Sequence, residues 1–192
     1  TATLTVGSEK TIAAVLAELT ANGKVVEIYA NDKKEVTGII VVTYSVDTVS
    51  DVKTATKNGS TYTEYTLAGG ESGKVYSVAA NGEKNSAVVN GTVAKGDVVT
   101  YVKPGSGKLY IYPTTKFEGT QSAKSATTLT INGTSYGIAL GVTSVTADGF
   151  ANTTTTSNYY VDQYGFVVKT NAIAETINYA IVDKIALVNG TG

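Results

Sequence analysis

The sequence has 192 residues, of which 42% are hydrophobic, and its formal net charge at pH 7 is −1. It contains no Arg, His, Cys, Met or Trp. These absences exclude a catalytic triad with a His base, a thiolate nucleophile, disulfides and the usual ligands of zinc, haem and iron–sulfur clusters. Because the 15 lysines are scattered among 16 acids, the composition also argues against nucleic acid as a partner.

The chain carries no run of apolar residues near the ~20 that span a bilayer, so we expect no membrane insertion. Residues 1–20 show neither an initiating Met nor a signal-peptide pattern, and we interpret the chain as a mature or excised piece. The absence of Cys and Met, which oxidise readily, suits a long-lived protein outside the cell. We therefore expect an extracellular location at the cell surface.

One segment near the N-terminus, Ser8 to Ala21, predicts an amphipathic helix. Its apolar residues recur at the spacing i, i+3, i+4, i+7, and Asn22-Gly23 can supply a left-handed stop. The apolar stripe has to pack on a sheet. It consists of Ile12, Val15, Leu16 and Leu19.

A β-hairpin is predicted directly after this helix. The β-branched runs V-V-E-I-Y-A (25–30) and V-T-G-I-I-V-V-T-Y (36–44) flank the turn residues N-D-K-K. Gly38 interrupts the second run, which predicts a bulge there. Residues 1–46 thus form a predicted helix-plus-hairpin unit.

From about residue 47 to 150, short alternating stretches are separated by glycine turns such as N-G-S, K-G-D and N-G-T. Regular strand spacing of this kind is typical of a β-barrel or a sandwich. The polar stretch 146–157 is predicted to be a connection. The predicted strands are T-V-S-D-V-K-T-A, T-Y-T-E-Y-T-L, K-V-Y-S-V-A, D-V-V-T-Y-V, K-L-Y-I-Y, T-L-T-I and T-S-Y-G-I-A.

Residues 151–192 predict a C-terminal hairpin followed by a strand. The stretch N-Y-Y-V-D-Q-Y-G-F-V-V-K (158–169) places a D-Q-Y-G turn between two strands, and the run 176–188 alternates and is rich in β-branched residues. This unit is placed to pair with residues 1–46. The predicted fold is therefore mainly β: an antiparallel barrel or sandwich with one short N-terminal helix and flanking hairpins.

Asp162 raises the first question of function, because it lies among four aromatic rings. It is either a catalytic or metal-ligating carboxylate or a residue that bonds the amides of its own turn while its neighbours pack. Turn chemistry favours the second reading. In that reading the residues that pack or pair across the strands are Tyr159, Val161, Phe166 and Val168.

The other acids suggest no assigned site. The spacing of a calcium loop is missing from the loose clusters at Asp32/Glu35, Asp47/Asp51 and Asp148. We therefore expect no cofactor, and calcium is the alternative. Glycoside hydrolysis needs two facing carboxylates, and nothing in the sequence pairs the available ones. We assign no catalytic, cofactor-binding or metal-binding residue and expect no enzyme. The acids considered for such a pair are Glu64, Glu71, Asp97 and Glu118.

Four stretches together resemble a known family. In order they are V-V-E-I-Y-A-N-D-K-K-E-V-T-G-I-I-V-V-T-Y, K-G-D-V-V-T-Y-V, N-Y-Y-V-D-Q-Y-G-F-V-V-K-T and I-N-Y-A-I-V-D-K-I-A-L-V. They resemble the repeated β modules of surface-layer (S-layer) proteins of clostridial-type Gram-positive bacteria. The resemblance implies a secreted structural protein that tiles the cell envelope. The separate anchoring segments of that family are not evident, which implies an assembly module.

The expected function is non-enzymatic self-assembly into an S-layer lattice, sheath or filament through β-strand contacts. The strand-like ends, residues 1–6 and 176–188, could complete the sheet of a neighbour. The expected partners are copies of the chain or neighbouring modules, with cell-wall glycan as a further candidate. The alternative is a cell-surface adhesin whose 13 tyrosines bind glycans. A pilin-like module with Lys–Asn cross-links is another.

Overall fold

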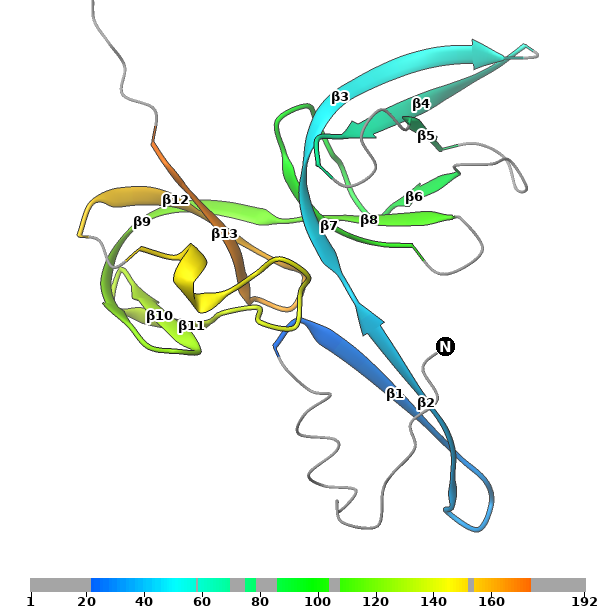
Figure 1. Ribbon diagram of the computed structural model, residues 1–192. Coiled ribbons are helices and arrows are strands. Elements are labelled where there is room, and N and C mark those ends of the chain that lie inside the picture. The colour runs from blue at the N-terminus through cyan, green and yellow to red at the C-terminus, as the bar shows by residue number, and fades with distance from the viewer. Residues whose placement is uncertain are drawn as a thin grey trace, which may run out of the picture.

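The computed structural model describes residues 22–57, 59–69, 75–78, 86–103, 108–151 and 154–173. This part of the chain is mainly β, and its sheets are almost entirely antiparallel, as predicted (Figure 1). Its single helix is a 3₁₀ turn, η1 (Ala147–Gly149). The helix predicted near residues 8–21 and the strand predicted at 176–188 lie outside the described residues.

The first hairpin forms where the sequence predicted it. Strand β1 (Lys24–Ala30) pairs antiparallel with β2 (Val36–Thr43), and the register shifts between Tyr29 and Ala30. The shift leaves Thr37, beside Gly38, as the extra residue, so the predicted bulge is confirmed. We call residues 24–43 the arm, because Figure 1 shows this ribbon extending away from the rest of the structure.

Six strands form the first large sheet, in the order β5-β4-β3-β7-β8-β6. All neighbours are antiparallel except β6 and β8. The two edge strands, each three residues long, meet at one isolated bridge between Ser77 and Ser86. The strands are β3 (Ser45–Lys57), β4 (Ser60–Leu67), β5 (Val75–Ser77), β6 (Ala87–Val89), β7 (Val98–Val102) and β8 (Leu109–Pro113).

Five strands form the second large sheet, in the order β11-β10-β9-β12-β13. Its edges approach at one bridge between Ile138 and Val167. The hairpin of β12 and β13 is the one predicted around Asp162. The strands are β9 (Thr115–Lys124), β10 (Thr128–Ile131), β11 (Thr134–Gly137), β12 (Thr156–Val161) and β13 (Val167–Ala172). We call the two large sheets together the body.

Two details of the predicted architecture differ from the structure. No closed barrel forms among the described strands, because the edges of each large sheet touch at a single bridge rather than along a ladder. The strands between residues 47 and 150 are also divided between the two sheets. Among the described residues, the C-terminal hairpin pairs with β9 through β12 and with neither β1 nor β2, and β9 is a long strand that the sequence pattern did not predict.

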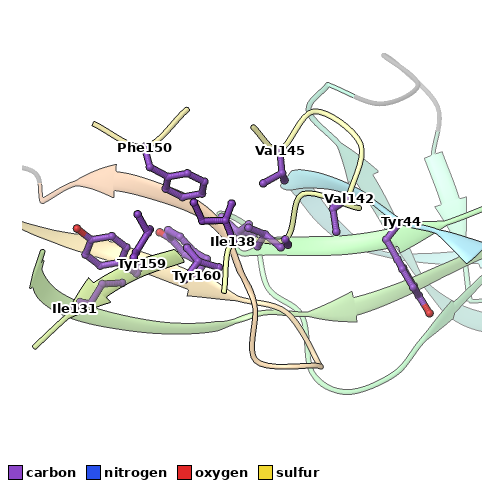
Figure 2. Close-up of a cluster of buried hydrophobic side chains, with 13 residues drawn as sticks. Tyr44, Ile131, Ile138, Val142, Val145, Phe150, Tyr159 and Tyr160 are labelled. Atoms are coloured by element: carbon purple, nitrogen blue, oxygen red, sulfur yellow. The ribbon is translucent and has the colours of Figure 1, made fainter. Parts of the chain in front are cut away.

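Two hydrophobic clusters hold the body together. The larger one is formed mainly by side chains of the five-stranded sheet and of the segment after β11, as Figure 2 shows for Ile138, Val142, Val145 and Phe150 of that segment. Burial of each such side chain contributes roughly 1.5–3 kcal/mol. The smaller cluster lies within the six-stranded sheet and consists of Val49, Tyr65, Leu67, Tyr76, Ala87, Val93, Val99, Leu109 and Ile111.

Candidate functional site

The arm presents two chemically different faces. Cross-strand partners in an antiparallel ribbon share a face, and successive residues alternate between faces. The core-side face carries Val25 and Val42, which pack against the larger hydrophobic cluster near the body. Toward the tip, the same face carries Tyr29, which is 51% exposed and donates to Glu27 Oε2 (2.7 Å), and Ile40.

Beyond Lys24 and Thr43 at the root, the opposite face of the arm is apolar. From the Val26–Val41 pair to the tip it carries no charged residue, and its two outermost large side chains, Ile28 and Val36, are 49% and 50% exposed. A two-stranded ribbon is marginally stable in water when it has no further packing. We call this surface the apolar face; it consists of Val26, Ile28, Ala30, Val36, Ile39 and Val41.

Asn31 organises the tip of the arm. Its Oδ1 accepts from the backbone amides of Lys33 and Glu35 (3.0 Å each), and its own backbone amide donates to the Glu35 carbonyl (3.0 Å). Lys34 closes the turn in the left-handed region, with φ 64°. The Glu35 carboxylate accepts from Asn31 Nδ2 (2.7 Å), so it is engaged in the turn itself.

Tyr44 anchors the root of the arm. It is the single residue between β2 and β3, it is buried, and its carbonyl accepts from the Thr143 amide (2.7 Å). Its ring meets that of Tyr112 edge to face at 5.5 Å, and its hydroxyl lies 3.3 Å from that of Tyr164. Burial, together with the Tyr164 hydroxyl, raises the pKa of Tyr44 well above its usual range.

The structure shows Asp162 bonded to the amides of its own turn. Oδ1 of Asp162 accepts from the amides of Tyr164 and Phe166 (2.9 Å each), which confirms the turn role predicted for it. Burial raises the pKa of Asp162 above its ordinary value of 3.8, and the hydrogen bonds from the Phe166 and Tyr164 amides oppose that rise. The predicted packing of Tyr159 and Val168 is confirmed, since both are buried in the core.

The two large sheets meet around a cleft with both polar and apolar lining residues. A hollow of about 260 Å³ lies between β3, β13 and the segment 144–150, and a second of about 250 Å³ adjoins it. Both are lined by Asp47 and by Ser144, whose φ is 69°. Nearby, Lys169 Nζ donates to Thr48 Oγ1 (3.0 Å) and ties the sheets together.

The acids considered as calcium ligands have separate surroundings. Asp47 accepts from the amides of Thr48 (2.7 Å) and Gly69 (3.0 Å), whereas Asp51 pairs with Lys53 at 2.8 Å, and this partner lowers the pKa of Asp51. Asp148 lies in the first turn of η1 and is exposed. Within the described ranges, no group of three or more acids is arranged to hold a metal ion.

The acids considered as a glycosidase pair lie on different elements. Glu64 is on β4 and Glu118 is on β9 of the other sheet, while Asp97 accepts from the Ala94 amide (2.8 Å) in the turn before β7. Glu71 lies outside the described residues. Sequence reasoning missed the cleft between the sheets, because its lining comes from segments far apart in the chain and no local motif marks it.

Comparison with known proteins provides no relative for this chain. No protein-family model matches it, and neither the curated proteins nor the solved structures contain a match. The described residues include no helix of the length and apolarity that crossing a membrane requires.

Proposed function

We propose that this chain is a non-enzymatic structural module of the cell surface that assembles with copies of itself, or with neighbouring modules, through β-strand contacts. The products would be a lattice of the S-layer kind, a sheath or a filament. Its place of action would be outside the cell, where a protein without Cys and Met withstands oxidation.

The arm is the observation that carries this proposal. It projects from the body as a ribbon of two strands, and no other strand among the described residues pairs with the outer edge of either one (Figure 1). Such edges present rows of backbone N–H and C=O groups that accept a further strand. Added strands gain affinity from the main chain and specificity from side-chain pockets on either face.

The strand-like ends of the chain supply the donors. Residues 1–6 (T-A-T-L-T-V) and 176–188 have the β-branched, alternating character that a donated strand needs. In the proposed assembly, one of these ends from one copy pairs with an arm edge of the next copy. Repetition of this head-to-tail contact builds an open polymer, since nothing forces the contact to close on itself.

Removal of residues 1–6 tests the proposal. Ordered assemblies in electron micrographs of the purified chain should disappear, while circular dichroism should still show a folded β body. A second variant, with residues 1–6 replaced by an equally long Gly-Ser run, separates loss of the strand from loss of chain length. If either variant still polymerises, exchange of this strand is not the mechanism.

Glycan binding is the second candidate function, and the cleft between the sheets favours it, because polar side chains line part of it. Asp47, Ser144 and Lys169 provide carboxylate, hydroxyl and ammonium groups along its walls. Outside the lining of the cleft, Tyr29 on the arm and Tyr164 in the Asp162 turn are exposed rings on which a sugar can stack. A glycan-array screen of the wild type beside Tyr29→Ala and Tyr164→Ala separates the two functions, because binding that these changes abolish supports an adhesin.

A further inference from the structure

The apolar face of the arm requires a cover. Its neighbour on the same ribbon, the core-side face, already packs against the body through Val25 and Val42. The apolar face points the opposite way and exposes about half of Ile28 and of Val36. Exposed apolar surface of this kind marks a site where another element packs.

We infer that residues 8–21 of the same chain form an amphipathic helix that lies on the apolar face. This inference does not depend on the proposed function, because it concerns how one copy completes itself. The stripe predicted for this helix carries no charge, as the apolar face carries none, and both are aliphatic. Lys10 and Glu18 fall outside the stripe at helical spacing and would face solvent.

The turn at the root of the arm is compatible with a helix that ends just before it. Gly23 has φ +86°, the left-handed conformation that ends many helices at the position after the last turn. A Cβ at Gly23 would lie 2.7 Å from Val142 Cγ2, so only glycine fits against the body there. The Asn22 carbonyl accepts from the Gly141 amide (2.7 Å), which fixes the point at which the preceding segment must end.

The dimensions of the two elements agree. Ile12 lies eleven residues before Gly23, or about 16 Å along a helix. Ile28 lies five residues after Gly23, or about 17 Å along a strand. A helix that runs back over β1 therefore brings Ile12 level with Ile28. By the same geometry, Leu16 and Val26 both lie about 10 Å from the turn.

Cross-linking in the full chain tests the inference, because the sequence contains no native Cys. The test variant carries Ile12→Cys with Ile28→Cys. The matched control carries Ile12→Cys with Ile40→Cys, since Ile40 is also exposed but lies on the core-side face. After treatment with a short bismaleimide, intact mass should show one intrachain linker in most of the test variant and in little of the control.

Other outcomes of this experiment overturn the inference. Equal intrachain yields in the two variants, or none in the test variant, would mean that the helix does not select the apolar face. A product found only as a covalent dimer would assign the face to a second copy. Hydrogen exchange in β12 and β13, unchanged from the wild type, verifies that each variant keeps a folded body.

A second variant pair measures the same contact without cross-linking. Leu16→Asp places a charge in the proposed contact and should speed amide exchange throughout β1 and β2 by about tenfold or more. Ala14→Asp introduces the same residue on the opposite side of the helix and should leave the arm's exchange near that of the wild type. If both changes speed exchange equally, or neither does, the apolar face has another cover.

Discussion

The arm and the β12–β13 hairpin share one turn geometry in two different environments. In each, an Asx residue opens a five-residue loop, and its side-chain oxygen accepts from the amides two and four positions later. In each, the fourth residue has positive φ, 64° at Lys34 and 84° at Gly165. Both hairpins also carry a bulge next to the loop, where the register shifts between Tyr29 and Ala30 and between Tyr160 and Val161.

Burial is what separates the two hairpins. Asn31 is exposed at the tip of the arm, whereas Asp162 is 5% exposed and lies against the core. Unlike Asn31, Asp162 can ionise, and its pKa is raised because burial excludes water around the carboxyl. Local sequence therefore determines the geometry of the turn, while burial determines how much each of its hydrogen bonds contributes to stability.

The largest effect is expected from removal of the two Asx side chains. Asp162→Ala leaves two amides of a buried turn without their acceptor and should lower the free energy of unfolding by about 2–3 kcal/mol in a urea titration. Asn31→Ala frees amides that water can reach and should destabilise the arm by about 1 kcal/mol or less, as measured by hydrogen exchange of its amides. Equal effects would contradict the role given to burial.

Substitution of the two residues with positive φ should change stability by an intermediate amount, with opposite sign in the two hairpins. Gly165→Ala should destabilise the body by about 1 kcal/mol. A Cβ at Gly165 meets nothing within 4 Å, so the backbone alone causes this loss. Lys34→Gly should stabilise the arm by about 0.5–1 kcal/mol, because the strained side-chain-bearing residue is relieved. Thermal unfolding measures the effect of Gly165→Ala, and hydrogen exchange of the arm amides measures that of Lys34→Gly. A loss of arm stability in Lys34→Gly would refute the shared geometry.

The smallest effect is expected in the pH dependence. A carboxyl with a raised pKa in the folded state binds its proton more tightly there than in the unfolded chain. Asp162 therefore contributes most stability at low pH and loses this contribution as pH rises from 3.8 through the raised pKa. Relative to Asp162→Asn, the wild type should be most stable in acid. Asn31→Asp, at the exposed counterpart, should show no comparable slope, and urea midpoints across pH check both.

Both hairpins were predictable from sequence because their information is local. Turn residues lie between alternating apolar runs, and Gly38 marks the bulge in β2. Of the candidate site residues, Asp162 was also predictable, since an Asp that opens a turn before an aromatic strand has amides within reach. Its burial was not predictable, because the segments that surround it lie far away in the chain.

Strand β9 shows why the rest of the fold could not be predicted. Its inward positions include Gly119 and Gln121, both buried, so the apolar alternation that marks a strand is missing. Gly119 is required there because a Cβ would collide with Ile131 Cγ2. Strand β6 is too short, at three residues, to produce a pattern. Without β9, pairing of the C-terminal hairpin with the five-stranded sheet could not be inferred.

The single-residue break at Tyr44 has a mechanical consequence. Strand β2 continues into β3, a strand of thirteen residues that pairs with β7 near its start and with β4 beyond. Tension applied to the arm would pass along the covalent backbone into β3, with Tyr44 held in place by Tyr112 and by the Thr143 amide. The ladder hydrogen bonds lie across this pull and would bear the load in shear, together, instead of opening one after another.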